Sequence, residues 1–164
     1  MKKALAIILC VVAVCFASCN KEKPNQKFIG NYNGDVTAEY KLSALGYDLD
    51  GDPLETNLTM VISAGQKDDQ VVAICTIEDE SRTVNGTVTD NFVDFDPLVI
   101  NEDIEGSQVN ITVDLNGTLN DNVMNVTGTL AGSGTIIYEE FPTPIPFTMT
   151  GTVNGALNKL VVTE

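Results

Sequence analysis

The chain has 164 residues, with 23 Asp or Glu against nine Lys or Arg, so its formal net charge at pH 7 is −14. Such an acidic surface repels polyanions, which makes nucleic acid and anionic membrane surfaces poor partners. Histidine is absent, which excludes Ser-His-Asp and Cys-His catalytic sites and His-ligated zinc. Arg82 is the only arginine and tryptophan is absent, which disfavours phosphate clamps and stacking platforms for sugars or bases.

Residues 1–18 have the pattern of a secretory signal peptide. Two lysines precede an apolar run of about 15 residues, and small residues end the run just before Cys19. A helix that crosses the hydrocarbon core needs roughly 20 apolar residues, so this run is too short to span a bilayer. The last four residues of the pattern, Phe16-Ala17-Ser18-Cys19, resemble the lipobox of bacterial lipoproteins.

The lipobox resemblance implies cleavage before Cys19 and attachment of fatty acyl chains such as palmitate to its thiol. Two or more chains anchor a protein stably without a spanning helix. We therefore expect a lipoprotein signal peptide over 1–18, a lipidated Cys19 with a flexible tether over 19–27, and a folded domain over 28–164. The expected location is the bacterial outer membrane, on its periplasmic or cell-surface side. An ordinary secreted protein cut near Ser18 is the alternative.

Cysteine usage agrees with this scheme. Cys10 and Cys15 leave with the signal peptide, and acylation of Cys19 leaves Cys75 as the one remaining thiol, so no intrachain disulfide forms. Cys75 lies in an apolar run over 71–77, which predicts a buried and unreactive side chain.

From Phe28 onward, apolar residues recur with a period of two, as in strands that pack on one face and meet water on the other. Asx, Gly and Pro clusters separate the runs. Antiparallel strands of this kind form an up-and-down barrel of about eight strands or, alternatively, a β-sandwich. The predicted strands are 30–44, 56–64, 70–77, 82–90, 91–100, 107–119, 122–138 and 146–162. Their alternation points ten side chains inward: Val36, Tyr40, Leu42, Met60, Ile62, Ile111, Val113, Leu115, Phe147 and Met149.

The stretch Phe28-Ile29-Gly30-Asn31-Tyr32-Asn33-Gly34 resembles the opening strand of the calycin-like, or lipocalin-like, barrel lipoproteins of Bacteroidota. The later Asn-Gly-Thr-Leu and Thr-Gly-Thr-Leu stretches are similar to that group as well. The resemblance implies an eight-stranded barrel outside the cytoplasm, with no settled activity. True lipocalins carry Trp where Tyr32 stands, and they carry a late Arg for which this sequence has no counterpart.

Asp48, Asp50 and Asp52 place carboxylates at alternate positions around Gly51, a spacing that calcium loops use. The EF-hand pattern also requires Gly one place after the third ligand and Glu at the twelfth position, and neither is present. An acidic hairpin loop is therefore the preferred interpretation. Ca²⁺ is the one cofactor for which the sequence offers candidate ligands.

Two other groups of residues are candidates for function. Asp94 and Asp96, with the acidic stretch 102–105, offer carboxylate pairs of the kind that hydrolyse glycosidic bonds. The proline-rich loop 141–147 either lines the mouth of the barrel or plugs it. An eight-stranded barrel holds one small ligand or fills its interior with side chains. Its interior contributes the candidate ligand contacts Tyr40, Met60 and Phe147.

Together these features predict a lipid-anchored, non-catalytic protein outside the cytoplasm that binds a small ligand or a partner protein. The membrane is its partner through the N-terminal lipid, and the ligand is unknown. A structural or adhesive surface protein with a β-sandwich fold is the alternative, and a carboxylate-based glycan hydrolase is the third candidate.

Overall fold

The computed structural model describes residues 23–104, 107–137 and 143–160. Cys19 and the expected signal peptide lie outside the described residues. Within the described ranges, no helix has the length and apolar character needed to cross a bilayer.

The described residues form one short 3₁₀ helix, η1 (Pro24–Phe28), followed by antiparallel strands. The strands are β1 (Gly30–Ala44), β2 (Tyr47–Asp50), β3 (Leu54–Ala64), β4 (Gln70–Ile77), β5 (Glu80–Thr89), β6 (Phe92–Phe95), β7 (Leu98–Ile104), β8 (Ser107–Asn120), β9 (Val123–Ile136) and β10 (Ile145–Lys159).

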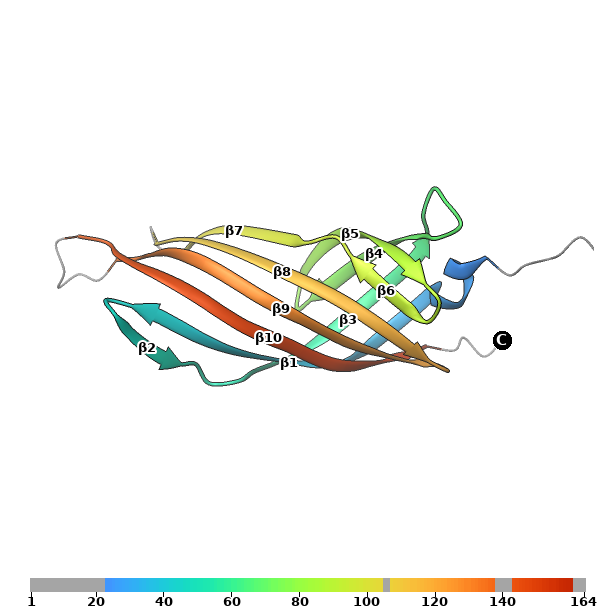
Figure 1. Cartoon of the computed structure of the whole chain (residues 1–164), viewed down its shortest axis with the longest axis horizontal. Helices are drawn as coiled ribbons and strands as arrows, with labels where there is room; N and C mark the ends of the chain where they lie inside the picture. The colour runs from blue at the N-terminus through green and yellow to red at the C-terminus, as the bar shows by residue number, and fades with distance from the viewer. Residues whose placement is uncertain (1–22, 105–106, 138–142, 161–164) are drawn as a thin grey trace, which may run out of the picture.

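The sheet closes because its last strand pairs with its first. The order of hydrogen-bonded strands is β10-β9-β8-β6-β5-β4-β3-β1-β2, and β10 also pairs antiparallel with β1 from Tyr32↔Lys159 to Ala44↔Phe147. β2 and β3 both pair with β1, one after the other along its length, so together they occupy one position in the ring. β6 and β7 pair with β8 in the same way. The ten strands therefore form a ring of eight positions (Figure 1). The predicted antiparallel barrel is confirmed, and the β-sandwich alternative is wrong because two separate sheets would lack the β10–β1 pairing.

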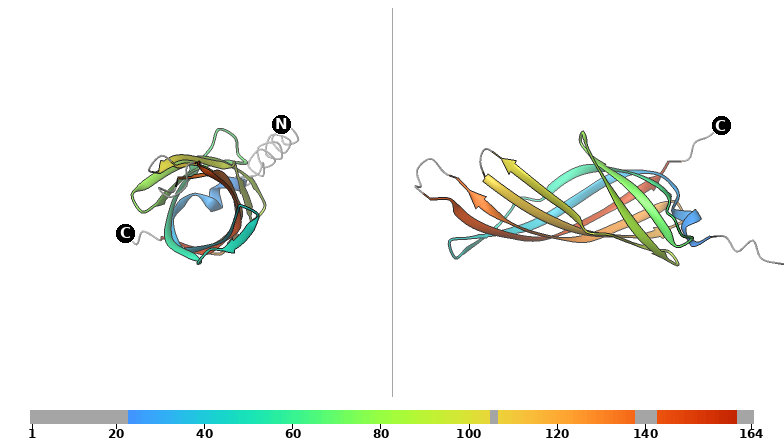
Figure 2. Two further views of the ribbon diagram at one scale, coloured as in Figure 1. Left: turned by 90° about the vertical axis from the view of Figure 1, so that its left-hand side faces the viewer. Right: turned by 90° about the horizontal axis from the view of Figure 1, so that it is seen from above.

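The barrel has two parts, which we call the closed half and the open half. In the closed half, β3 to β6 complete the ring with β1, β8, β9 and β10. β3 begins opposite Ala38, so β1 beyond that residue pairs with β2 instead. In the open half, β2, β1, β10, β9, β8 and β7 therefore form a curved sheet whose edges are β2 and β7 (Figures 1 and 2).

Apolar side chains fill the closed half. Tyr32, Met60, Val71, Val93 and Leu157 are fully buried there, on strands from all sides of the ring. The predicted inward direction is confirmed for eight of the ten predicted positions, those that are buried or pack against the core. Of the ten predicted positions, Val36, Met60, Ile62 and Phe147 are buried, while Tyr40, Val113, Leu115 and Met149 pack partly buried against the core.

The helix η1 lies across the ring at the closed half (Figure 2). Phe28 is fully buried, and the buried Asn25 donates hydrogen bonds from Nδ2 to the carbonyl oxygens of Gln70 (2.8 Å) and Lys67 (3.3 Å). Residues 24–27 therefore belong to the folded domain, and the prediction of a flexible tether is wrong for them. The buried part of this segment is a single polar side chain held by backbone carbonyls, a contact that hydrophobic periodicity does not detect.

Two strand predictions also differ from the structure. The predicted strand 91–100 is divided into β6 and β7, because the break falls at Pro97, which has no N–H to donate to a ladder. β2 was predicted as part of a loop, since its Asp-Leu-Asp sequence is typical of turns. It forms a strand because β1 extends beyond β3 and offers it a free edge.

We expect Gly34→Ala to destabilise the barrel by about 1–3 kcal/mol, the usual cost of overpacking. A Cβ at Gly34 would lie 2.1 Å from the carbonyl oxygen of Ala156, so β1 and β10 would have to separate. The matched control is Gly132→Ala, whose Cβ would lie 3.1 Å from the nearest atom, the carbonyl oxygen of Asn110. Urea unfolding of both variants measures the difference, and equal costs would contradict the close approach at Gly34.

Candidate functional site

The inner face of the open half carries large apolar side chains that remain exposed. Tyr47 is 73% exposed, Leu49 62% and Leu54 59%. Each points inward, because its cross-strand partner does: Tyr47 pairs with Ala44, Leu49 with Leu42 and Leu54 with Ala38. Side chains from the other strands of the open half continue this face, namely Leu98, Ile100, Ile111, Val113, Ile136 and Met149.

The exposure has a topological cause. The β4–β5 hairpin turns between Ile77 and Glu80, and Ile77 pairs with Leu58 in the closed half. No described strand continues the hairpin alongside β2 or β7. The strands β4 and β5, which cover one side of the core in the closed half, therefore do not extend over the open half.

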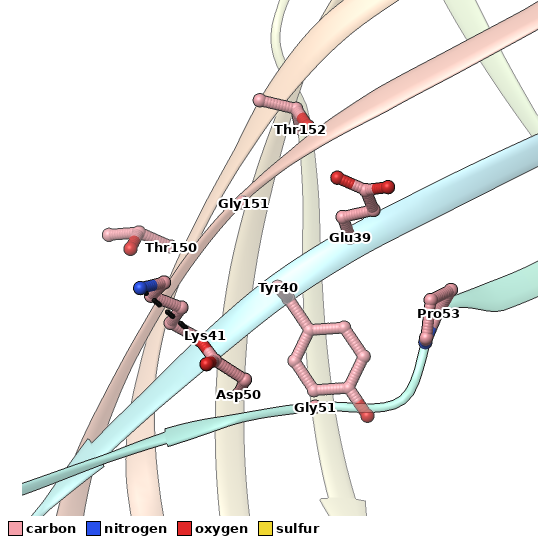
Figure 3. A pocket seen from close by; sticks show the side chains of 9 residues that line it. All are labelled: Glu39, Tyr40, Lys41, Asp50, Gly51, Pro53, Thr150, Gly151 and Thr152. Atoms are coloured by element: carbon pink, nitrogen blue, oxygen red, sulfur yellow. Dashed lines mark ion pairs between the residues drawn. The ribbon is translucent and has the colours of Figure 1, made fainter.

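The three sequence-predicted ligand contacts lie in different environments. Met60 is 0% exposed and belongs to the filled core of the closed half. Phe147 is buried against Gly134, where a Cβ would lie 2.8 Å from the phenyl ring. Tyr40 is partly buried in the open half, and its ring packs on Gly51, where a Cβ would lie 2.3 Å from Cε2 (Figure 3). Only Tyr40 of the three thus remains partly exposed.

A depression of about 540 Å³ lies beside β1, β10 and the segment that links β2 to β3. Its lining combines outward side chains such as Glu39, Thr150 and Thr152 with Tyr40, which packs against the core (Figure 3). An ion pair between Lys41 Nζ and Asp50 Oδ1, 3.2 Å apart, crosses it. Both side chains are mostly exposed, so this pair adds little stability.

The predicted calcium ligands do not converge. Asp48 accepts a hydrogen bond from Ser43 Oγ, Asp50 pairs with Lys41, and Asp52 is exposed beyond the end of β2. Alternate residues of a strand are separated by roughly 6.6 Å, whereas oxygen ligands lie about 2.3–2.6 Å from a calcium ion. Within the described ranges, no three Asp, Glu, Cys or His side chains are close enough to hold a metal ion.

The candidate hydrolytic carboxylates Asp94 and Asp96 are both exposed. Asp94 points outward from β6 and is exposed. Asp96 follows the end of that strand and accepts a hydrogen bond from Asn85 Nδ2 at 3.3 Å. Residue 105 of the acidic stretch, and residues 138–142 before β10, lie outside the described residues.

A basic side chain that sequence reasoning missed lies at the closed end. Lys159 Nζ is 5.6 Å from the centroid of the Tyr32 ring and donates a hydrogen bond to the carbonyl oxygen of Lys27 at 2.9 Å. Gly30, with φ of +148°, makes room for the lysine stem, since a Cβ there would lie 2.6 Å from Lys159 Cε. The contact joins β1, β10 and η1.

Two acidic groups in the closed half are deeply buried. The Tyr32 hydroxyl has no hydrogen-bond partner among the described residues, and burial raises its pKa from 10.0 to about 12. The Cys75 thiol is buried, as predicted, and burial raises its pKa from 9.0 to about 11. Burial also lowers the pKa of Lys159, which sits over the Tyr32 ring.

Comparisons with known proteins show no family that matches the sequence and no curated protein that matches it. Among solved structures, the chain is similar to the crystal structure of a protein of unknown function from the DUF3598 family of Nostoc punctiforme. The two share 11% identity with a TM-score of 0.33 over 82% of this chain and 48% of the other. The chain thus spans about half the length of that structure.

We expect the free energy of unfolding to fall as the pH rises from about 9 to about 12. Over that range the unfolded chain loses the Cys75 and Tyr32 protons, while the folded chain keeps the Cys75 proton up to about pH 11 and the Tyr32 proton up to about pH 12. Tyr32→Phe removes the part of this loss between about pH 10 and 12, and it is at least as stable as the wild type at pH 8 because the unpartnered hydroxyl is gone.

Urea unfolding of the wild type and Tyr32→Phe at several pH values tests this expectation. Both proteins keep Lys159, whose lowered pKa acts in the opposite direction, so the difference between them isolates the phenol. Parallel pH profiles for the two proteins would show that Tyr32 titrates normally in the folded state.

Proposed function

We propose that this protein is a lipid-anchored, non-catalytic binding protein outside the cytoplasm, and that the inner face of the open half holds a small apolar ligand. The observation that carries this proposal is the contrast between the two halves. The closed half buries its inward side chains completely, whereas Tyr47, Leu49 and Leu54 point inward and stay more than half exposed.

The energetics of burial support a ligand at this face. Burying a Leu side chain fully is worth about 1.5–3 kcal/mol, and these three side chains still have more than half of their area to bury. A ligand that covers them gains several kcal/mol, and micromolar affinity requires about 8 kcal/mol. The ligand must therefore also contact neighbouring inward side chains such as Leu42 and Ile100.

The lipobox resemblance supports an anchor at Cys19, and the fold then has a consequence for orientation. Only residues 20–23 separate Cys19 from η1, and four extended residues span at most roughly 15 Å. The closed half, which η1 covers, would thus lie next to the bilayer. The open half would point away from the membrane and take its ligand from the aqueous phase.

Binding of the uncharged fluorescent probe N-phenylnaphthylamine tests the apolar face. We expect Leu49→Asp to weaken binding of the probe by about tenfold or more, because it places a charge where the probe loses water. The control is Val61→Asp, which adds the same charge to an exposed apolar residue on the outer face of β3. Equal affinity of both variants, or no binding by the wild type, would contradict the proposed ligand site.

The proposed anchor has its own test. In the native host, we expect radiolabelled palmitate to be incorporated into the wild type and not into Cys19→Ala, because the thiol is the only group that the lipobox assigns to acylation. We also expect the variant to leave the membrane fraction. Mass spectrometry of the N-terminal peptide provides the control, and a free Cys19 in protein from cell envelopes would refute the anchor while leaving the ligand site open to its separate test.

A further inference from the structure

The segment that supplies the exposed apolar side chains of the open half also carries acidic residues. Tyr47 and Leu49 on β2 and Leu54 on β3 point inward, as their cross-strand partners do. Four exposed acids lie among and beside them in the chain: Asp48, Asp50, Asp52 and Glu55. Consecutive Cα atoms are about 3.8 Å apart, and the Debye length at physiological salt is about 8 Å. Salt therefore screens only part of the field that these carboxylates produce beside the apolar face.

Charge is distributed unevenly over the barrel. At the closed end, η1 with its flank, the neighbouring turns and the end of β10 hold four lysines and four aspartates: Lys23, Lys27, Lys67, Lys159, Asp68, Asp69, Asp90 and Asp121. The other described residues include fourteen acids but only two basic residues, Lys41 and Arg82. These acids include Glu102 and Asp103 on β7, across the open half from β2. The closed end is thus balanced in charge, and the rest of the described chain is strongly acidic.

The two basic residues outside the closed end do not neutralise the acids around the apolar face. Lys41 Nζ pairs with Asp50 Oδ1 at 3.2 Å, and Arg82 lies at the β4–β5 hairpin, where it pairs with Glu80 at 3.1 Å. Within the described ranges, no lysine or arginine forms an ion pair with Asp48, Asp52 or Glu55. A ligand that enters the open half therefore meets a negative potential.

The inner face itself offers an ionic ligand no countercharge on four of its strands. The inward positions of β1, β2, β9 and β10 in the open half hold apolar residues, glycine and tyrosine. A charged head group must therefore stay in water at the margin of this face. At β2, which ends the order of described strands, the neighbouring groups are the exposed ring of Tyr47 and the carboxylates of Asp48 and Asp52. These groups repel an anion, whereas the carboxylates and the face of an aromatic ring attract a cation.

We propose that the ligand of the open half is a cationic amphiphile, an apolar chain or ring that carries a protonated amine or a quaternary ammonium group. The apolar part covers Leu49 and Leu54, and the cationic head lies beside Tyr47, Asp48 and Asp52. Burial of apolar surface supplies most of the affinity, and charge complementarity selects a cation over an anion. The ligand class rests on the proposed function, because it assumes that the inner face of the open half is a binding site.

The test compares three amphiphiles with chains of equal length and different charge, each below its micelle-forming concentration: decyltrimethylammonium, decanoyl-N-methylglucamide and decanoate. Calorimetric titration uses the full chain with Cys19→Ala, so that no acyl chain or detergent competes for the apolar face. We expect the cation to bind at least about tenfold more tightly than decanoate, with the uncharged glucamide between them. We expect this difference to shrink in about 1 M salt, where the Debye length is about 3 Å.

Two double variants locate the charges that select the ligand. Asp48→Asn with Asp52→Asn removes two carboxylates beside β2, and we expect it to weaken binding of decyltrimethylammonium by about threefold to tenfold while binding of the glucamide stays unchanged. The control, Asp90→Asn with Asp121→Asn, removes two carboxylates from turns at the closed end. Asp90 and Asp121 have φ of 51° and 54°, a conformation that Asn also adopts readily. We expect the control to bind the cation like the wild type.

Other outcomes would overturn the ligand class. Equal affinity for the three amphiphiles, or tighter binding of decanoate, would contradict selection of a cation. A preference that stays unchanged in high salt, or that both double variants lose equally, would show that the acids beside β2 do not cause it. N-phenylnaphthylamine is uncharged and reports on the apolar face alone. Binding of that probe without binding of any decyl ligand would overturn the ligand class only, whereas the absence of both would overturn the proposed function as well.

Discussion

Pairing of the last strand with the first is the interaction on which the rest of the structure depends. β10 forms a ladder with β1 over almost the full length of both strands, and this ladder turns a meandering sheet into a ring. The two backbones approach so closely that glycine occupies inward positions on both strands, with Gly34 on β1 and Gly151 on β10. Long-range pairing of the chain ends thus determines both the shape of the barrel and where its interior can be filled.

The two halves of the barrel follow from unequal strand lengths. β1, β8, β9 and β10 have 14 or 15 residues, whereas β4 and β5 have 8 and 10. The long strands continue past the short ones, so the same inward alternation that builds a packed core in the closed half leaves apolar side chains exposed in the open half. Helix η1 closes the packed end, with Lys159 holding its last turn to Tyr32.

Charge and topology act on the same surface. Repulsion between copies that each carry a formal charge of −14 opposes association through the exposed apolar side chains of Tyr47, Leu49 and Leu54. The acidic residues concentrate near the open half, where the strands β2 and β7 end the sheet.

The amino-acid sequence by itself determined the all-β class, the barrel and the inward face of most strands. Period-two alternation is a local property, and residues such as Met60, Ile62 and Phe147 carry it without reference to their partners. Cys75 could likewise be placed in the interior from its apolar neighbours.

Tertiary structure alone decided the features that depend on which strands meet. Asn25 is buried where the carbonyl oxygens of Lys67, in the β3–β4 turn, and Gln70, at the start of β4, accept hydrogen bonds from its side-chain amide. Asp48 and Asp50 lie in a strand instead of the predicted acidic hairpin loop because β1 extends past β3 and offers an edge. Leu49 and Tyr47 alternate like core residues but remain exposed to water, because no strand covers them. Whether a strand covers them depends on the length and register of several strands, which no single segment encodes.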